Sequence, residues 1–481
     1  MKKILFISSE VVPFIKTGGL ADVAGSLPKY YAKKKYDVNI ILPNYMCIPK
    51  KWKEKMKYQF HIYMHVRGKE QYAGVLKLEH EGLTFYCIDS EYYFNGEAPY
   101  GDNGWDVEKF AFFSKAALGI LPTLGFRPDV IHCHDWQAGL VPVYLDHFRR
   151  YDEFYTGIKT IMTIHNLQFQ GRWSTEMLQE CSGLPAEYFT ADKLGLDDGG
   201  ASCLKGGLAY ADYITTVSDS YAQEIKTQEY GEGLDSLLNE RADVLCGIVN
   251  GIDYREYNPT TDTMIANKFN KVHAQAEKVK NKLALQAELG LAKNAETMLV
   301  GVVSRLTAQK GFDLVEYVME ELCTENIQLV VLGTGEERYE SLFRSYAQKY
   351  PNRVSANIYY SEEMSHKIYA ACDVFLMPSR FEPCGLSQLM SLRYGTVPLV
   401  RETGGLRDTV EPYNEYEKTG TGFGFANYNA HEMLDTLRYA QHIYYGNKQE
   451  WYAMVKRGMT KDFSWKNSAK QYEKLYDKLT K

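Results

Sequence analysis

The chain lacks the patterns that would point to a disulfide-bonded, zinc-binding or membrane-spanning protein. Its nine cysteines include no C-x-x-C pair, so we expect reduced thiols rather than a disulfide framework or a zinc cluster. No segment approaches the roughly 18 consecutive apolar residues that a membrane span needs. The apolar run after Lys3 ends at Ser8, which is too short for the core of a signal peptide. We therefore expect a soluble, cytoplasmic protein.

The chain also lacks an excess of charge of one sign. The 55 Lys and Arg residues are matched by 61 Asp and Glu residues, a net charge of −6. This balance provides no general attraction for nucleic acid or for an anionic membrane surface, so we expect neither as a partner. The length of 481 residues fits two large globular domains. Any anion that the protein binds must be held by local geometry.

Short apolar runs alternate with amphipathic helical patterns in both halves of the chain. Because the runs are rich in Ile, Val and Leu without polar alternation, they indicate parallel strands buried on both faces. We therefore predict two doubly wound α/β domains with a boundary near Asn250-Gly251, followed by a Lys-rich helix over about 266–289. The predicted strands are Lys3–Ser8, Val38–Leu42, Asp129–His132, Thr160–Ile164, Tyr213–Val217, Leu299–Ser304, Gln328–Leu332, Val374–Met377 and Val397–Val400.

A glycine pair, Gly18-Gly19, follows Lys16 between the first predicted strand and a helix. Backbone N–H groups at such a helix N-terminus can bind an anion, and Lys16 would add a full charge. The spacing matches neither the P-loop of NTPases nor the G-x-G-x-x-G of dinucleotide-binding enzymes. The alternative is a tight turn with no ligand.

Two further strand ends carry groups suited to a diphosphate. Arg305 and Lys310 lie five residues apart after one predicted strand, and Thr403-Gly404-Gly405 follows another. The Arg can act as a bidentate fork and the Lys as a point charge. A solvated basic loop is the alternative, although two such elements in one half of the chain favour a diphosphate pocket.

Glu382 lies in Phe381-Glu382-Pro383-Cys384 at a third strand end. A carboxylate there can accept hydrogen bonds from sugar hydroxyls or offset positive charge in a transition state. The alternative is an acid that only favours the dipole of the following helix. Cys384 is expected to be a small packed residue rather than a nucleophile.

A group of histidines in the first half invites comparison with a metal site. His132 and His134 share a strand face next to Asp135, and His165 ends the next strand. No further ligand follows at metal spacing, so we expect hydrogen-bonding roles and no metal. The 38 tyrosines could include rings that stack on sugars, although most are expected in the core.

Together these segments resemble the bacterial glycogen synthase and plant starch synthase family of retaining glucosyltransferases. The resemblance extends from Lys2 to the C-terminal tail. It is carried by Lys16–Val23, His134-Asp135-Trp136, Thr163-Ile164-His165-Asn166, Val249–Asp253, Ser379–Leu386 and Thr403–Leu406, in the family's order.

The resemblance implies the GT-B fold, in which two Rossmann-like domains face each other across a cleft. The implied ranges are an N-terminal, acceptor-side domain over 1–248, a donor-binding domain over 249–460, and a helix over 461–481 that crosses back to the first domain. The implied donor is ADP-glucose and the implied acceptor is the non-reducing end of an α-1,4-glucan, either glycogen or a maltooligosaccharide. No cofactor or metal requirement is implied, and nothing indicates the oligomeric state.

Site roles follow from the same resemblance. Arg305 and Lys310 would neutralise the leaving diphosphate, Glu382 would lie at the reacting sugar, and Asp135 and His165 complete the implied catalytic set. The implied substrate-binding residues are Lys16, Gly18, Gly19, Asp22, Asn166, Asn250, Cys384, Gly385, Leu386, Thr403, Gly404 and Gly405.

One position departs from the wider group of retaining GT-B enzymes. These enzymes often carry a second Glu eight residues after the first, and Met390 occupies that position here. Glycogen synthases commonly lack this second Glu. Alternatives to the implied activity are a GT-B enzyme that uses UDP-glucose or another acceptor, and a catalytically silent glucan-binding protein.

Overall fold

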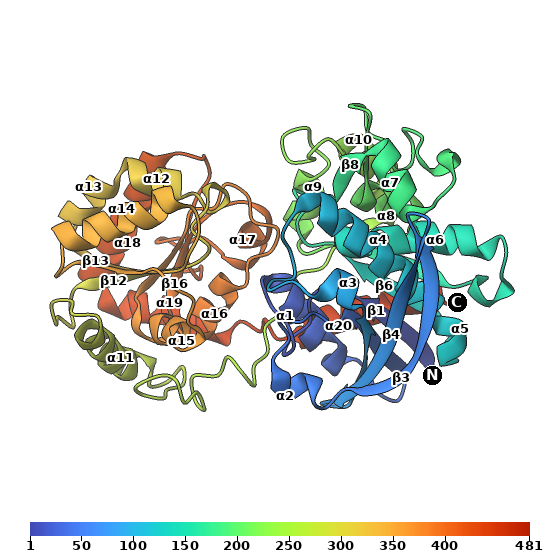
Figure 1. Ribbon diagram of the computed structural model, residues 1–481. Coiled ribbons are helices and arrows are strands. Elements are labelled where there is room, and N and C mark those ends of the chain that lie inside the picture. Colours follow the sequence, from blue (N-terminus) through green and yellow to red (C-terminus); the bar gives the residue numbers. More distant parts are fainter. The chain divides into compact units, whose positions relative to one another are not determined.

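The computed structural model describes the chain from Met1 to Lys481, apart from the side chain of Asn103, and it forms two compact units (Figure 1). Unit 1 comprises Met1–Gly251 and Trp465–Lys481, and unit 2 comprises Ile252–Ser464. Each unit has a mostly parallel sheet packed with helices. The prediction of two doubly wound α/β domains is confirmed.

The sheet of unit 1 has nine strands in the order β11-β10-β7-β6-β1-β2-β5-β4-β3. The pairs are parallel except those that β4 makes with β3 and β5. The chain leaves β1 toward β2 and later builds the other half of the sheet from β6, so the order reverses between β1 and β6. Open α/β sheets bind ligands at such a reversal. The strands are β1 (Lys2–Ile7), β2 (Tyr36–Pro43), β3 (Lys57–Val66), β4 (Lys69–His80), β5 (Leu83–Asp89), β6 (Val130–His134), β7 (Lys159–Ile164), β10 (Tyr213–Thr216) and β11 (Leu245–Gly247), beside a small sheet of β8 (Arg172–Ser174) and β9 (Gly200–Ser202).

The sheet of unit 2 has six parallel strands in the order β14-β13-β12-β15-β16-β17. Here the order reverses between β12 and β15, so the loops after these two strands flank the expected ligand position. The strands are β12 (Met298–Val303), β13 (Ile327–Leu332), β14 (Val354–Asn357), β15 (Val374–Met377), β16 (Val397–Arg401) and β17 (Phe423–Phe425).

The helices bury their apolar faces against these sheets. Figure 1 shows α20, coloured red, among the blue elements of unit 1. Within the described part of the chain, no helix combines the length and apolar character needed to cross a membrane. Unit 1 contains α1 (Gly19–Ser26), α2 (Lys50–Lys53), α3 (Glu91–Phe94), α4 (Asn103–Gly119), α5 (Leu121–Leu124), α6 (Leu140–Arg149), α7 (Thr175–Ser182), α8 (Cys203–Tyr210), α9 (Asp219–Glu224), α10 (Asp235–Glu240) and α20 (Trp465–Leu479). Unit 2 contains α11 (Ala274–Glu288), α12 (Phe312–Tyr317), α13 (Met319–Thr324), α14 (Glu337–Lys349), α15 (Glu362–Ala371), α16 (Ser387–Arg393), α17 (Gly404–Thr409), α18 (Ala430–Gly446) and α19 (Lys448–Thr460).

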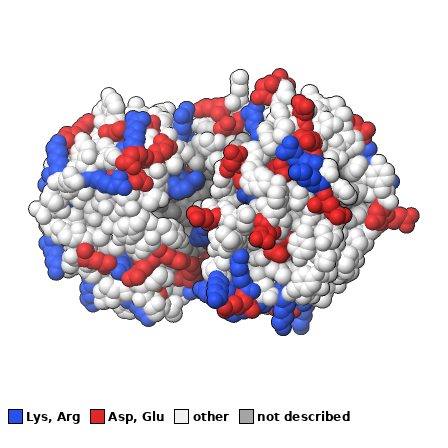
Figure 2. Space-filling model, viewed as in Figure 1, with Lys and Arg blue, Asp and Glu red and all other residues white. Residues whose placement is uncertain are grey.

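Charged residues of both signs are interspersed over the visible face of each unit (Figure 2). No continuous basic tract runs across that face. This distribution accords with the small net charge of the chain.

The Lys-rich helix of unit 2 begins later than the predicted 266. Helix α11 starts at Ala274, because the preceding segment is folded into turns by asparagine side chains. Asn270 Oδ1 accepts hydrogen bonds from the backbone N–H groups of Val272 and His273. Such local side-chain bonds compete with helix formation.

The C-terminal helix α20 packs its apolar face on the rest of unit 1, which is formed by Met1–Gly251. Tyr476 is fully buried there, and its hydroxyl lies 3.0 Å from the Tyr31 hydroxyl and 2.9 Å from Nδ1 of His132 on β6. Asp477 on the exposed side pairs with Lys35 and with Lys2. The helix therefore reaches the central strands of the unit through specific polar contacts as well as through burial.

We expect Tyr476→Phe to lower the free energy of unfolding of unit 1 by about 1–3 kcal/mol, because it leaves two buried polar groups without this partner. Tyr45→Phe is the matched control, since the Tyr45 hydroxyl is buried and makes no hydrogen bond with any described residue. That change should be neutral or slightly stabilising. Urea unfolding of both variants checks the prediction, and equal effects would contradict it.

Candidate active site

The switch point of unit 2 brings a lysine and a buried glutamate together. Lys310, on the loop after β12, places its Nζ 2.6 Å from Oε2 of Glu382, on the loop after β15. Glu382 is only 5% exposed, and the Ser379 hydroxyl donates to the same carboxylate oxygen at 3.1 Å. A buried carboxylate is tolerated when it is paired and hydrogen-bonded in this way. The pair therefore places a cation and a carboxylate side by side at the carboxyl edge of the sheet.

Glycines allow the loops of this site to pack directly on one another. Gly404 has φ +46°, and a Cβ there would lie 2.0 Å from the carbonyl oxygen of Glu382. The N–H of Gly405 donates to that same carbonyl at 3.0 Å. Gly311, with φ +76°, makes an equally close approach to the Pro378 carbonyl. The Gly404-Gly405 pair is thus required by packing, whatever ligand the site binds, and it brings the start of α17 against the Glu382 loop.

The other site residues expected in unit 2 lie on the loops that follow β12, β15 and β16. Arg305 is exposed directly after β12, so its guanidinium is accessible to a ligand. Cys384 is 4% exposed and Thr403 is 1% exposed, which places both in the packed base of the site. Gly385 adopts φ +74°, and Leu386 is the N-cap residue of α16.

The glycine loop of unit 1 is organised by a glutamate that the sequence analysis did not select. Glu10 is 3% exposed and accepts hydrogen bonds from the N–H groups of Thr17 and Gly18, at the start of α1. It also accepts from the hydroxyls of Thr17 and Tyr100, both at 2.7 Å. Of the glycine pair expected to approach an anion, the Gly18 N–H is therefore bonded to an internal carboxylate. One sequence signal could have identified Glu10. It is an acidic residue that lies shortly after the first strand and before Thr17-Gly18-Gly19.

Lys16 lies on the exposed part of the same loop. Its Nζ is 2.8 Å from Oδ1 of Asp22 on α1. The pair joins two of the expected substrate-binding residues and orients the lysine along the helix N-terminus. Gly19 is exposed beside it.

Asp135 follows β6 at the switch point of unit 1 and has an unusual backbone conformation. Its φ of +56° and ψ of −177° lie in a backbone region that residues other than glycine rarely adopt. Its Oδ1 accepts hydrogen bonds from the N–H groups of His165, at 2.7 Å, and Asn166, at 3.4 Å. Burial raises the pKa of Asp135 to about 7, although these two N–H groups act in the opposite direction. Strain and a perturbed carboxyl together mark a functional position.

Three histidines lie beside Asp135 and are neutral at pH 7. His134 Nδ1 is 3.0 Å from His165 Nε2, and His132 Nε2 is 2.6 Å from the Thr163 hydroxyl. Burial lowers the pKa of His132 and of His165 to about 3, and it lowers that of His134 as well. Among the described residues, no group of three or more His, Cys, Asp or Glu side chains is placed to hold a metal ion. The histidines thus form hydrogen-bonded contacts around the end of β6 and β7.

Asn250 lies near the end of the main segment of unit 1 and is 5% exposed. Its side-chain oxygen accepts no hydrogen bond from any described residue. Asn166 is half-buried, and its Oδ1 accepts from the N–H of Gln168 at 3.1 Å. The structure therefore places most of the expected residues in two groups, one at the switch point of each unit. Asn250 belongs to neither group and lies near the end of the main segment of unit 1.

An added methyl group is expected to affect the Gly404 loop and the Gly18 loop differently. Gly404→Ala should lower the free energy of unfolding by about 2 kcal/mol or more and reduce transfer, because the Cβ overlaps the Glu382 carbonyl. Gly18→Ala should leave stability unchanged, since a Cβ there meets nothing within 4 Å and φ is −155°. Thermal unfolding and transfer assays of both variants check this. Equal stability of the two would show that the Gly404 contact is dispensable.

Comparison with known proteins places both halves of the chain among glycosyltransferases. The family model for the starch synthase catalytic domain matches residues 3–240, and that for glycosyl transferases group 1 matches residues 287–450. The chain is 64% identical over 479 residues to a glycogen synthase of Lachnospira eligens, with 100% of each covered. It is 48% identical over 479 residues to a glycogen synthase of Geobacillus thermodenitrificans, covering 100% of this chain and 98% of the relative.

Solved structures give the same assignment. The catalytic domain of starch synthase IV from Arabidopsis thaliana, solved bound to ADP and acarbose, superposes with a TM-score of 0.92 at 33% identity. That match covers 100% of this chain and 99% of the other. A sucrose-phosphate synthase from Thermosynechococcus elongatus shares the fold, with a TM-score of 0.63, 16% identity, and coverage of 100% and 99%.

Proposed function

The chain belongs to the glycogen synthase family of hexosyltransferases, and we propose that it transfers glucose from ADP-glucose to the non-reducing 4-hydroxyl of an α-1,4-glucan with retention of configuration. The observation that carries the proposal is the Lys310–Glu382 pair on the two loops that flank the switch point of unit 2. It supplies a cation and a carboxylate where an α/β sheet binds its ligand. The ADP in the similar starch synthase IV structure supports the choice of nucleotide.

Charge neutralisation is the main demand of the proposed reaction. As the bond between glucose C1 and the diphosphate oxygen breaks, negative charge develops on the diphosphate and positive charge on the sugar. Arg305 and Lys310 stabilise the diphosphate, and the Glu382 carboxylate offsets the positive charge on the sugar. We propose that these fixed charges act without a metal ion.

Retention follows from attack on the face that the diphosphate leaves. In the proposed step, the acceptor 4-hydroxyl oxygen forms the new bond to C1 while the C1–diphosphate bond breaks. The hydroxyl proton passes to an oxygen of the departing diphosphate. This step needs no covalent intermediate on Glu382, and a trapped glucosyl-enzyme would contradict it.

Unit 1 contributes the remaining residues of the proposal. We assign Lys16, Asp22 and the Gly18-Gly19 loop to donor binding, and Asp135 and His165 to the sugar and the acceptor. The hydrogen bond from the His165 N–H to Asp135 supports a shared role for these two residues.

A donor assay tests the activity and separates it from the nearest alternative. ADP-glucose and UDP-glucose are each supplied with and without glycogen, and nucleotide release and glucan growth are measured. We expect glycogen-dependent ADP release, a clear preference for ADP-glucose, and no loss on adding EDTA. Preference for UDP-glucose, or ADP release without glucan growth, would contradict the proposal. Loss of glucan growth with EDTA would contradict the metal-free mechanism.

We further propose that the reaction takes place in the cytoplasm. All nine cysteines are free thiols in the structure, which suits a reducing compartment. Cell fractionation with an antibody to the chain would test this.

A further inference from the structure

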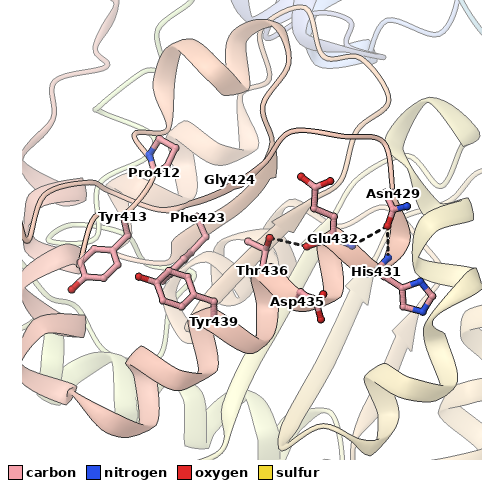
Figure 3. Close-up of a pocket in the computed structure, with 10 residues that line it drawn as sticks. All are labelled: Pro412, Tyr413, Phe423, Gly424, Asn429, His431, Glu432, Asp435, Thr436 and Tyr439. Atoms are coloured by element: carbon pink, nitrogen blue, oxygen red, sulfur yellow. Dashed lines mark hydrogen bonds between the residues drawn. The ribbon is translucent and has the colours of Figure 1, made fainter. Parts of the chain in front are cut away.

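Unit 2 contains a pocket of about 620 Å³ that shares no residue with the candidate active site. It lies along the edge strand β17 and the helix α18, whereas the active-site loops follow β12, β15 and β16. Its volume is typical of small-ligand sites. The lining residues are Pro412, Tyr413, Phe423, Gly424, Asn429, His431, Glu432, Asp435, Thr436 and Tyr439 (Figure 3).

Aromatic rings gather at one end of this pocket (Figure 3). The Tyr439 ring centroid lies 5.6 Å from that of Phe423 and 6.4 Å from that of Tyr413. Both tyrosines are half-buried, with Phe423 buried beneath them. The Tyr413 N–H donates to the Gly422 carbonyl at 2.8 Å, which fixes this residue next to β17. The result is a preformed apolar wall with hydroxyls at its rim.

A further tyrosine stands beside this wall. Tyr416 is 89% exposed, more than the other large hydrophobic side chains. Its turn is fixed because Asn414 Oδ1 accepts from the N–H groups of Tyr416 and Glu417. Because Asn414 directly follows Tyr413 of the lining, this turn holds the backbone of Tyr416 next to the aromatic end of the pocket.

The polar end of the pocket carries carboxylates beside a hydrogen-bonded helix start. Asn429 Oδ1 caps α18 by accepting from the N–H groups of His431 and Glu432. Glu432 in turn accepts from the N–H of Ala426 at 2.8 Å. The Asp435 side chain is 69% exposed, and its Oδ1 accepts a hydrogen bond from Nη1 of Arg438 at 3.0 Å. These bonds fix the backbone at this end, and the largely exposed Asp435 carboxylate can accept a hydrogen bond from a ligand hydroxyl.

The charge of the lining limits what can bind. The ten lining residues include the carboxylates of Glu432 and Asp435 but no Lys or Arg, so a phosphate or nucleotide is disfavoured. A neutral ligand with an apolar ring face and hydroxyl donors fits both ends, because tyrosine rings cover apolar surface while carboxylates accept from hydroxyls. Sugar chains have this combination.

We infer that the pocket formed by Tyr413, Tyr439 and Asp435, together with Tyr416, is a second carbohydrate site that binds a segment of an α-1,4-glucan chain away from its reacting end. The inference rests on the proposed function, since the glucan is the proposed acceptor. Holding the polymer at a second point raises the effective concentration of its chain ends. The site should therefore affect KM for glycogen while leaving kcat and short acceptors unaffected.

The test measures binding and turnover separately. Wild type, Tyr416→Ala and Tyr416→Ala/Tyr439→Ala are compared for retardation in native gels containing glycogen, without ADP-glucose. Glucose transfer is then measured with glycogen and with maltotriose. Tyr151→Ala is the matched control, because Tyr151 is 77% exposed but belongs to unit 1. Thermal unfolding verifies the fold, and the exposed Tyr416 keeps one variant informative if the double variant unfolds.

We expect the double variant to bind glycogen at least tenfold more weakly and to show a similar rise in KM for glycogen. Its kcat with maltotriose should stay within twofold of the wild-type value, and the control should match wild type. Unchanged retardation of a folded double variant, or of Tyr416→Ala if the double variant unfolds, would overturn the inference, as would retardation competed by ADP rather than by maltoheptaose. A wild type that binds glycogen through these residues but transfers no glucose would support the site and overturn the proposed function.

Discussion

Replacing Glu382 with Ala or Gln is expected to lower kcat at least a hundredfold while ADP affinity stays within about threefold. The carboxylate is buried and held at 2.6 Å from Lys310, and loss of one preorganised charge at a reacting centre typically costs 10²–10³ in kcat. Glu382→Gln keeps the shape and an acceptor for the Ser379 hydroxyl, so it isolates the charge. Steady-state kinetics and calorimetric titration with ADP provide the measurement. Near-normal turnover in either variant would remove Glu382 from the reacting centre.

The two cations of the same site provide controls for this result. Lys310→Ala leaves Glu382 buried without its ion-pair partner, so it should destabilise unit 2 by about 3–5 kcal/mol as well as reduce transfer. Arg305 is exposed, and Arg305→Ala should cost at least ~2 kcal/mol in kcat/KM with little change in stability. A comparable loss of stability in Arg305→Ala would show that its effect on activity is indirect.

Most of the central buried strands were predictable from sequence, whereas the partly exposed strands β3 and β4 were missed, as was β5, although most of its residues are buried. β1, β12 and β15 each contain a short apolar run, and β6 begins with one at Val130-Ile131, so these strands and the loops after them could be anticipated. The β3–β4 hairpin alternates between buried and exposed positions along part of its length. A search for uninterrupted apolar runs does not detect such strands.

The candidate site was predictable where its residues occupy strand ends. Lys310 and Glu382 are 72 residues apart, yet both follow strands that flank the switch point, so parallel topology brings them together. Glu10 was missed because its role depends on Tyr100, 90 residues away, and on the path of the glycine loop. The contact of His132 with Tyr476 spans 344 residues and depends on where α20 docks. Such partners follow from packing rather than from local pattern.

Asp135→Asn is expected to abolish most of the transfer activity and, above pH 7, to increase the stability of unit 1. The folded pKa of about 7 lies above the ordinary aspartate value of 3.8. Between these values the folded state binds a proton that the unfolded state lacks, so this group makes the free energy of unfolding fall as pH rises through that window. The full effect is at most roughly 4 kcal/mol. Asn keeps an acceptor for the His165 N–H while removing the charge.

The neighbouring histidines require that this effect be measured as a difference between variants. His132 and His165 have folded pKa values of about 3, so the unfolded state binds more protons below pH 6.5 and their contribution slopes the opposite way. Both histidines remain in Asp135→Asn, so their contribution cancels when its free energy of unfolding is compared with that of wild type. Urea unfolding at pH 5, 6, 7 and 8 should show the difference growing with pH and levelling off above 7. A difference that is flat over this range would mean that Asp135 is already ionised at pH 5, and the raised pKa would then be wrong.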